Sequence, residues 1–303
     1  MSYLQTALHK IAEKIGSEPV LLLRSKTRLI LGILMLSLIA LTGCDAIIAP
    51  VFGNIEATLN PTSTRAGLQI AQAVETIPHD NQSFTQGFLI HEGTIYESAG
   101  RYGLSELRQV DLETGDVIRS VPVDDQYFAE GLTLVDDRLI QITWREGTAL
   151  VYDLESFELI DTYTYTGEGW GLCYDELTDQ LYMSDGSTYL YTRDPETFEV
   201  TGQITVTVDG EQISNINELE CVGDAIYANV WQTDAVLEID KVTGVTRNLI
   251  YGGQLLTAEE RASLEAGGVL NGIAYDAEND AFYLTGKLFP AMWRVEFIPV
   301  ERE

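Results

Sequence analysis

The sequence predicts an all-β fold built from one repeated unit, and three observations carry this prediction. A short motif ending in glycine and an apolar residue recurs, each copy is followed by an apolar strand, and four copies end in an acidic turn. A period of about 40 to 50 residues with about four strands per unit is typical of a β-propeller. Five copies of the motif predict five blades.

The glycine motif has four regular copies and one degenerate copy. The regular copies are residues 85–88 (TQGF), 129–132 (AEGL), 169–172 (GWGL) and 270–273 (LNGI). In the fifth, residues 218–221 (ELEC), we place Glu220 at the glycine position. The glycine positions are then 44, 40, 49 and 52 residues apart.

Each copy precedes an apolar or aromatic strand. These strands are residues 95–97 (IYE), 139–141 (LIQ), 181–183 (LYM), 226–228 (IYA) and 282–284 (FYL). The acidic turns are residues 111–115 (DLETG), 153–157 (DLESF), 194–198 (DPETF) and 240–244 (DKVTG). Short apolar runs bounded by Asp and Gly turns predict strands with little helix between them.

The two ends of the repeat region predict a closed ring. The last copy ends after residues 292–297 (MWRVEF) without an outer strand, and residues 73–77 (AVETI) precede the first motif without a unit of their own. We expect this N-terminal strand to complete the last blade, because closure removes exposed sheet edges. Residues 257–260 (TAEE) predict a capping box that opens a short helix ending near Gly267, inserted between two units.

The amino terminus predicts a targeting segment. Arg24, Lys26 and Arg28 precede the apolar run 29–41, which ends in the sequence LTGC at residues 41–44. Basic residues, a short apolar run and small residues are typical of a secretory signal, and the run is shorter than the roughly 20 residues of a membrane span. The sequence LTGC resembles a bacterial lipobox, in which the cysteine is lipidated.

We therefore expect a lipoprotein signal peptide over residues 1–43, lipidated Cys44 and a linker over 44–65, and the propeller over 66–303. An uncleaved anchor and a plain secretory signal are the alternatives. The signal predicts an extracytoplasmic protein on the periplasmic or cell-surface side of a membrane, held there only through its N-terminal lipid. We expect a monomer.

Charge and histidine content exclude several functions. The chain has 47 acidic and 18 basic side chains, with a formal net charge of -29. This excess repels nucleic-acid phosphates and anionic lipid headgroups, so neutral or cationic partners are favoured. The three histidines are His9, His79 and His91, too few and too scattered for a zinc site of several histidines.

A set of short motifs resembles the plant and bacterial type of glutaminyl cyclase. They are residues 84–87 (FTQG), 97–105 (ESAGRYGLS), 128–132 (FAEGL), 169–172 (GWGL), 184–187 (SDGS), 217–220 (NELE), 228–231 (ANVW), 270–274 (LNGIA) and 285–287 (TGK). The resemblance covers about residues 72–298. It departs from the family pattern at Ala129, where glycine is usual, and at Phe289, where tryptophan is frequent.

The resemblance implies a five-bladed propeller that converts N-terminal glutamine of peptides and proteins to pyroglutamate and releases ammonia. This family is unrelated to the zinc-dependent animal type and requires no cofactor; a structural calcium ion stays open. The implied active-site set comprises Gln86, Glu130, Trp144, Trp170, Asn217, Trp231 and Lys287.

Chemistry singles out Glu130 within this set. Cyclisation needs an acceptor for a proton of the α-amine, donors for the oxyanion and a proton for the departing ammonia. Glu130 is the acid just before a repeat glycine, where the other copies place Gln86, Trp170, Leu219 and Asn271. If these positions face the axis, they hold one acid, which we expect to shuttle the proton.

The other roles follow with alternatives. Lys287 holds Glu130 ionised or stabilises the oxyanion, and Asn217 and Gln86 donate to the carboxamide oxygen or orient the amine. The three tryptophans form the pocket walls.

Each of these residues also has a purely structural interpretation. A buried Glu can tie blades together or hold a cation, repeated tryptophans can be core, and Lys287 can merely neutralise a buried acid. Cys173 and Cys221 follow the motif in successive units, so both a disulfide and two free thiols are open. A calcium-dependent propeller lactonase or esterase and a non-catalytic binding scaffold are the competing functions.

Overall fold

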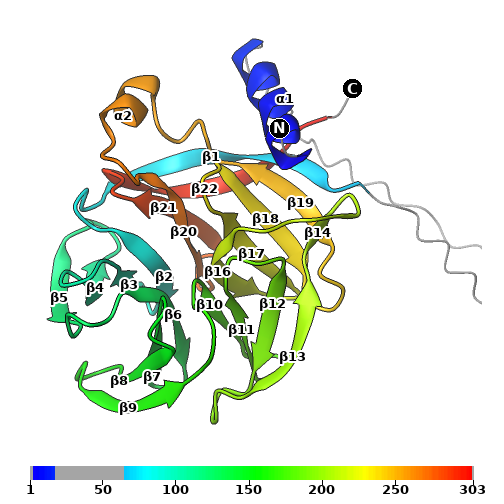
Figure 1. Cartoon of the computed structure of the whole chain (residues 1–303). Helices are drawn as coiled ribbons and strands as arrows, with labels where there is room; N and C mark the ends of the chain where they lie inside the picture. Colours follow the sequence, from blue (N-terminus) through cyan, green and yellow to red (C-terminus); the bar gives the residue numbers. More distant parts are fainter. Residues whose placement is uncertain (1–2, 18–64, 302–303) are drawn as a thin grey trace, which may run out of the picture.

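The computed structural model describes residues 3–17 and 65–301. The regular structure of this part of the chain is almost entirely β-strand, arranged in sheets around a common centre (Figure 1). Its two helices are α1 (Tyr3–Ser17) and α2 (Ala258–Ser263). Of the targeting segment only residues 3–17 are described; Arg24, Lys26, Arg28, the run 29–41 and Cys44 lie outside the described residues. No described helix is long and apolar enough to cross a membrane.

Three sheets have four antiparallel strands in sequence order. The first comprises β2 (Thr85–His91), β3 (Thr94–Ala99), β4 (Glu106–Asp111) and β5 (Val117–Pro122). The second comprises β6 (Ala129–Val135), β7 (Arg138–Thr143), β8 (Thr148–Asp153) and β9 (Leu159–Thr164). The third comprises β10 (Leu172–Asp175), β11 (Gln180–Ser184), β12 (Tyr189–Arg193) and β13 (Val200–Thr205).

The remaining sheets are an eight-stranded sheet, in the order β16-β17-β18-β19-β1-β22-β21-β20, and the small hairpin β14-β15. One half of the large sheet comprises β16 (Ile216–Val222), β17 (Ala225–Val230), β18 (Ala235–Asp240) and β19 (Thr246–Tyr251). The other comprises β20 (Val269–Asp276), β21 (Ala281–Lys287), β22 (Ala291–Pro299) and β1 (Gly67–Pro78). The hairpin is β14 (Thr207–Val208) with β15 (Glu211–Gln212).

The N-terminal strand lies where the sequence predicts it. β1 pairs antiparallel with β22 from Gln69 opposite Pro299 to Pro78 opposite Ala291. It is longer than the expected residues 73–77, and its first residues also pair in parallel with β19. The last strand of the chain is therefore not an exposed edge, which limits edge-to-edge association.

The first strands of the sheets form the centre of the fold. β2 contacts β6, β6 contacts β10, β10 contacts β16, β16 contacts β20, and β20 contacts β2. Figure 1 shows these five strands near the middle of the molecule, with β5, β9 and β13 at its periphery. β2 and β6 are largely buried, whereas β5 and β9 are mostly exposed. This is a propeller-like all-β fold in which residues of the first strands lie deepest.

The acidic turns are stabilised by their own aspartates. Oδ1 of Asp111 accepts from the main-chain N–H groups of Glu113 and Thr114 and from the Thr114 hydroxyl. Asp153, Asp194 and Asp240 bond their own turns in the same way. The repeated Asp thus accepts from main-chain N–H groups that a tight turn leaves without a main-chain acceptor.

The predicted helix insertion is present and shorter than expected. The Thr257 hydroxyl accepts from the Glu260 N–H at 3.2 Å, and the Glu260 carboxylate accepts from the Thr257 N–H at 2.8 Å. This capping box opens α2, which ends at Ser263, before Gly267. Sequence reasoning missed α1, whose Leu4 and Leu8 are buried in one apolar cluster with residues of β16 to β19.

Candidate active site

The residue before each repeat glycine sits in an irregularity of the first strand. The pairing register shifts between Thr85 and Gly87, between Ala129 and Leu132, and between Leu270 and Ile273. These shifts leave Gln86, Glu130 and Asn271 outside the regular ladder, and all three are buried. A bulge re-aims a side chain that would otherwise follow the pleat.

The degenerate copy corrects our alignment. Its register shifts between Ile216 and Leu219, so Asn217 takes the position of Glu130, and Glu218 takes the glycine position. The placement of Glu220 at the glycine and Leu219 before it was wrong by two residues. Leu219, buried like Leu132, is the apolar residue that follows the motif. The corrected register puts Asn217, which only the family resemblance had singled out, among the residues nearest the axis.

Close contacts between repeats explain the glycines. A Cβ on Gly131 would lie 2.5 Å from the main-chain nitrogen of Leu172, and one on Gly171 would collide with the main-chain oxygen of Asn217. The Gly131 N–H also donates to the Trp170 carbonyl at 2.9 Å. Any side chain at these positions would push neighbouring first strands apart, because the backbone on the other side cannot rotate away.

Glu130 and Gln86 are in direct contact. Nε2 of Gln86 donates to Oε1 of Glu130 at 3.0 Å, and both side chains are buried. Three buried amide oxygens at equivalent positions of the repeat have no protein partner within the described residues. They are Oε1 of Gln86 and Oδ1 of Asn217 and Asn271. Buried acceptors without a partner cost free energy, so this is a site prepared to receive hydrogen-bond donors.

Burial determines the protonation of Glu130. It raises the pKa of this carboxyl well above its ordinary value of 4.5; the charge of Lys287 opposes the rise, and the negative charges of Glu168 and Glu146 add to it. Burial also lowers the pKa of Lys287 to about 8, against the opposing charges of Glu130 and Glu218. The described ion pairs include none between Lys287 and Glu130, and the Lys287 ammonium lies 5.0 Å from the ring centre of Phe84.

The three predicted tryptophans fall into two groups. Trp170 and Trp231 are packed edge to face at 5.5 Å between ring centres. Trp144 packs against Phe128 at 5.6 Å, and Phe128 contacts Phe84 at 6.3 Å. All three tryptophans are half-buried. Aromatic rings that are partly exposed beside buried polar groups can contact a bound ligand as well as the core.

Sequence reasoning missed four residues of this region. Glu168 accepts hydrogen bonds from the indoles of both Trp144 and Trp170, and Glu218 is a second buried acid whose carboxylate accepts from the Ile273 N–H at 2.8 Å. Phe84 and Phe128 stand two residues before Gln86 and Glu130. The equivalent positions of Phe84 and Phe128 in two repeats could have identified them from the sequence. The only sequence signal for Glu218 was that its repeat lacks the glycine. With the corrected register, the positions before the repeat glycine hold one acid, Glu130, and Glu218 is a second buried acid at the neighbouring glycine position.

A buried polar network holds the segments that carry Gln86 and Lys287. The carboxylate of Glu97 accepts from the hydroxyls of Ser83 and Thr85 and contacts Nε2 of His79 at 3.1 Å. Nδ1 of His79 is 3.0 Å from the carbonyl oxygen of Phe289. The network therefore links the residues just before Gln86 to those just after Lys287.

Cys173 and Cys221 form a disulfide between β10 and β16, with their Cα atoms 5.5 Å apart. This bond joins the first strands of two successive sheets. Trp170 precedes one of these strands, and Asn217 lies in the other.

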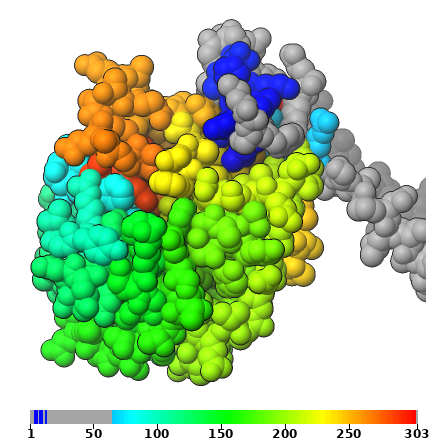
Figure 2. Space-filling view, in the orientation of Figure 1, coloured from blue at the N-terminus to red at the C-terminus, as the bar shows by residue number. Residues whose placement is uncertain are grey.

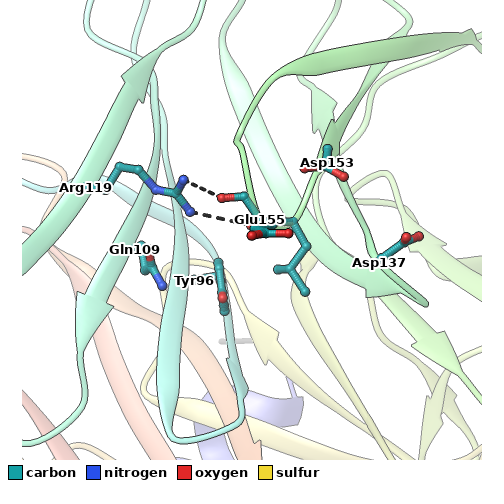
Figure 3. A pocket seen from close by; sticks show the side chains of 7 residues that line it. Tyr96, Gln109, Arg119, Asp137, Asp153 and Glu155 are labelled. Carbon is teal, nitrogen blue, oxygen red and sulfur yellow. Dashed lines mark hydrogen bonds between the residues drawn. The ribbon is translucent and has the colours of Figure 1, made fainter.

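A surface cavity lies elsewhere, between the first two sheets (Figure 3). Its volume is about 510 Å³, and Tyr96, Gln109, Arg119, Asp137, Asp153, Leu154 and Glu155 line it. Arg119 donates to the main-chain oxygens of Leu154 and Glu155. None of the seven expected active-site residues lines this cavity. Within residues 3–17 and 65–301, no three His, Cys, Asp or Glu side chains come together as a metal-binding group.

Comparisons with known proteins agree with one another. Residues 46–297 match the family model described as glutamine cyclotransferase. A glutaminyl-peptide cyclotransferase of Arabidopsis thaliana is 38% identical over 232 residues, which are 74% of this chain and 70% of that protein. The crystal structure of Myxococcus xanthus glutaminyl cyclase superposes with a TM-score of 0.73 at 35% identity, covering 78% of this chain and 100% of that one. The chain belongs to the glutamine cyclotransferase family.

Proposed function

We propose that the protein is a glutaminyl-peptide cyclotransferase, which converts the N-terminal glutamine of peptides and proteins to pyroglutamate and releases ammonia. One observation carries the proposal: Glu130 is a buried acid with a raised pKa, bonded to Gln86 and electrostatically coupled to Lys287. The names of the two relatives support the reaction class.

In the proposed reaction the α-amine nitrogen attacks the side-chain carboxamide carbon of glutamine, and the bond from that carbon to the amide nitrogen then breaks. Glu130 takes one proton from the amine and returns it to the leaving nitrogen, which departs as ammonia. The carboxyl ends in its starting state. An α-amine titrates near 7.7 to 8.0. The raised pKa of Glu130 brings the pKa values of the proton donor and the proton acceptor closer together, which favours proton transfer in both directions.

The amide oxygens and Lys287 bind the amine and the oxyanion, respectively, in the proposed reaction. The unpartnered oxygens of Gln86, Asn217 and Asn271 are acceptors and suit the N–H groups of the amine. An oxyanion is stabilised most by charged donors, which favours the Lys287 ammonium over the neutral amide of Asn217 for that role. The pKa of Lys287 is lowered to about 8, so its side chain is still protonated in most protein molecules at neutral pH. Trp144, Trp170 and Trp231 pack on the amide and the aliphatic stem of the substrate and exclude water.

One assay tests the function. Residues 66–303 are incubated with a Gln-initiated peptide, and ammonia release and the mass loss of one ammonia are followed. We expect both, and the same peptide with an acetylated α-amine should not react. If the peptide releases no ammonia and loses no mass over prolonged incubation with the folded protein, the proposal is wrong.

The competing functions predict other results. A calcium-dependent lactonase or esterase needs several acids converging on a metal, but the turn aspartates bond their own turns. Chelator should abolish such an activity and leave the cyclisation intact. A non-catalytic scaffold should bind peptides without turnover. We propose that cyclisation needs no cofactor; a structural calcium ion would appear as a chelator-dependent fall in the melting temperature without loss of activity at low temperature.

We further propose that the fold has five blades. The cyclic contacts of β2, β6, β10, β16 and β20 support this count. So does the eight-stranded sheet, whose two antiparallel halves are joined through the parallel pairing of β1 with β19. Each half then supplies one blade, and β1 is the outer strand of the last.

Location and assembly are further proposals. The basic residues, apolar run and Cys44 support a lipoprotein of the extracytoplasmic side, and the Cys173–Cys221 disulfide suits an oxidising compartment. Mass spectrometry of the mature N-terminus should find a lipidated Cys44, and Cys44→Ala should release the protein from membranes. We propose a monomer, which size-exclusion chromatography with light scattering would test.

A further inference from the structure

Glu168 connects two walls of the candidate active site. Its Oε2 accepts from Nε1 of Trp144 at 2.8 Å and from Nε1 of Trp170 at 3.0 Å. Trp144 follows β7 and Trp170 precedes β10, so the two rings come from successive repeats. The Gly169 N–H also donates to the Trp144 carbonyl at 2.9 Å, which holds the two segments side by side.

The second oxygen of Glu168 is occupied as well. Nε of Arg145 donates to Oε1 at 2.9 Å, and the guanidinium stacks 3.6 Å from the ring centre of Trp144. An indole has one N–H and no acceptor, so the partner of that N–H decides the plane of the ring. Hydrogen bonds to an ionised carboxylate are stronger than neutral ones. One carboxylate therefore orients both indoles, and Trp170 passes this orientation to Trp231 through ring packing.

Glu168 also acts on Glu130 through its charge. Burial alone would raise the pKa of Glu168, but hydrogen bonds from Trp170, Trp144 and Arg145 hold it below 4.5. Glu168 is therefore ionised while Glu130 titrates, and its negative charge raises the pKa of Glu130. The other charged groups acting on Glu130 are Glu146, which adds to the rise, and Lys287, which opposes it.

We propose that Glu168 is a positioning residue for the cyclisation: its carboxylate fixes the indoles of Trp144 and Trp170 as the pocket wall. The inference rests on the proposed function. Glu168 does not take part in proton transfer itself, since both of its oxygens are engaged by these three donors.

Three variants separate the two effects. Glu168→Gln removes the charge and keeps one acceptor oxygen, and Glu168→Leu removes both charge and acceptors. Glu146→Gln is the matched control: Glu146 also raises the pKa of Glu130, but its Oε1 accepts from the Tyr102 hydroxyl rather than from an indole. The chain has four tryptophans, so a ¹H–¹⁵N spectrum contains four indole N–H signals, which Trp→Phe variants assign.

We expect both Glu168 variants to move the Trp144 and Trp170 indole signals together, and Glu146→Gln to leave that of Trp170 in place. Glu168→Leu should raise KM about tenfold, the loss expected for a hydrogen bond to a charged acceptor. The acid side of the kcat/KM profile should move to lower pH in both Gln variants, further in Glu168→Gln. In the wild type, both indole signals should titrate together as Glu168 is protonated.

Two results would overturn the proposal: unchanged Trp144 and Trp170 signals with unchanged KM in Glu168→Gln, or equal effects of Glu146→Gln on signals and KM. If Glu168→Leu does not fold, Glu168→Gln and the wild-type titration decide. Failure of the proposed function is a separate outcome, because a wild-type protein that forms no pyroglutamate still gives indole signals that test the link between Glu168 and the two tryptophans.

Discussion

Gln86 donates a hydrogen bond to Glu130 at 3.0 Å, and the two residues hold the same position in successive repeats. The bond uses the amide nitrogen of Gln86, so its unpartnered oxygen is left as an acceptor beside the carboxylate. Polar residues at one position of successive repeats therefore place an acid beside a hydrogen-bond acceptor, and no additional loop is needed to bring them together.

Replacing Glu130 with Gln should remove the proton shuttle and keep the fold. General acid–base groups contribute about 100- to 10,000-fold to rate, so kcat/KM should fall by that factor with an unchanged circular dichroism spectrum. Glu155→Gln, the same change at an exposed side chain of the surface cavity, is the control and should stay within about twofold of wild type. Full activity in a folded Glu130→Gln protein means that another group moves the proton.

The pH profile should have two limbs. Activity should fall as the pH drops through the raised pKa of Glu130, because the protonated carboxyl cannot accept a proton. It should also fall as the pH rises through about 8, because Lys287 loses its charge there. The peptide amine titrates in the same range, so a lysine variant is needed to separate the two.

Lys287→Arg provides that separation. Arginine stays charged at every accessible pH, so the ratio of variant to wild-type kcat/KM should rise above pH 8, although the maximum is lower because the guanidinium has a different shape. A constant ratio across this range would remove Lys287 from the pH dependence.

The fold was predictable from the sequence because its signals repeat. Glycine at the crowded centre, apolar second strands and Asp-stabilised turns each recur with one period, so a weak local signal is confirmed by its other copies. The strand that pairs with β22 followed from a simple count of missing strands. The degenerate copy was misaligned because Glu218 and Glu220 flank Leu219, and only the pairing register reveals which of them replaces glycine.

The site was predictable only where it follows the repeat. Gln86 and Glu130 occupy an equivalent position, which the sequence displays directly. Glu168 holds the repeat position of Phe84 and Phe128, but those two residues are aromatic, and the bonds of Glu168 to two indoles depend on how neighbouring sheets meet. The same holds for His79 and Glu97, which are 18 residues apart and pair inside the protein.

The His79–Glu97 pair should make stability depend on pH. Burial alone would raise the pKa of Glu97, but His79, Arg108 and Ser83 lower it from 4.5 to about 2. Its contribution is therefore complete above 4.5 and lost as the pH falls through 2. Burial alone would lower the pKa of His79, but the charge and hydrogen bond of Glu97 raise it above 6.5. That contribution is complete below 6.5 and lost as the pH rises through the folded pKa.

The pair therefore stabilises the protein most between these limits, and His79→Gln should cost more free energy of unfolding near pH 5.5 than at alkaline pH. Glu97→Gln should cost about 3 to 5 kcal/mol, because Arg108 is left buried without one of its partners. Urea unfolding at several pH values measures both. A pH-independent cost of His79→Gln would show that the histidine is neutral in the folded protein.

Gly186 should prove important for the position of Trp170. Its φ is +79°, and an added Cβ would lie 2.6 Å from Cζ2 of the Trp170 ring. Gly186→Ala should therefore push the indole out of place, raise KM several-fold and change the tryptophan fluorescence. Gly210→Ala is a matched control, because Gly210 has a φ of +88° and no atom within 4 Å of an added Cβ.

Both alanine variants should lose about 1 to 2 kcal/mol of stability from the left-handed backbone. Only Gly186→Ala should affect catalysis, since only there does the new methyl group meet an active-site ring. If the two variants lose stability equally and both keep the wild-type KM, the contact with Gly186 does not hold Trp170 in its working position, and the bond from its indole to Glu168 is sufficient to do so.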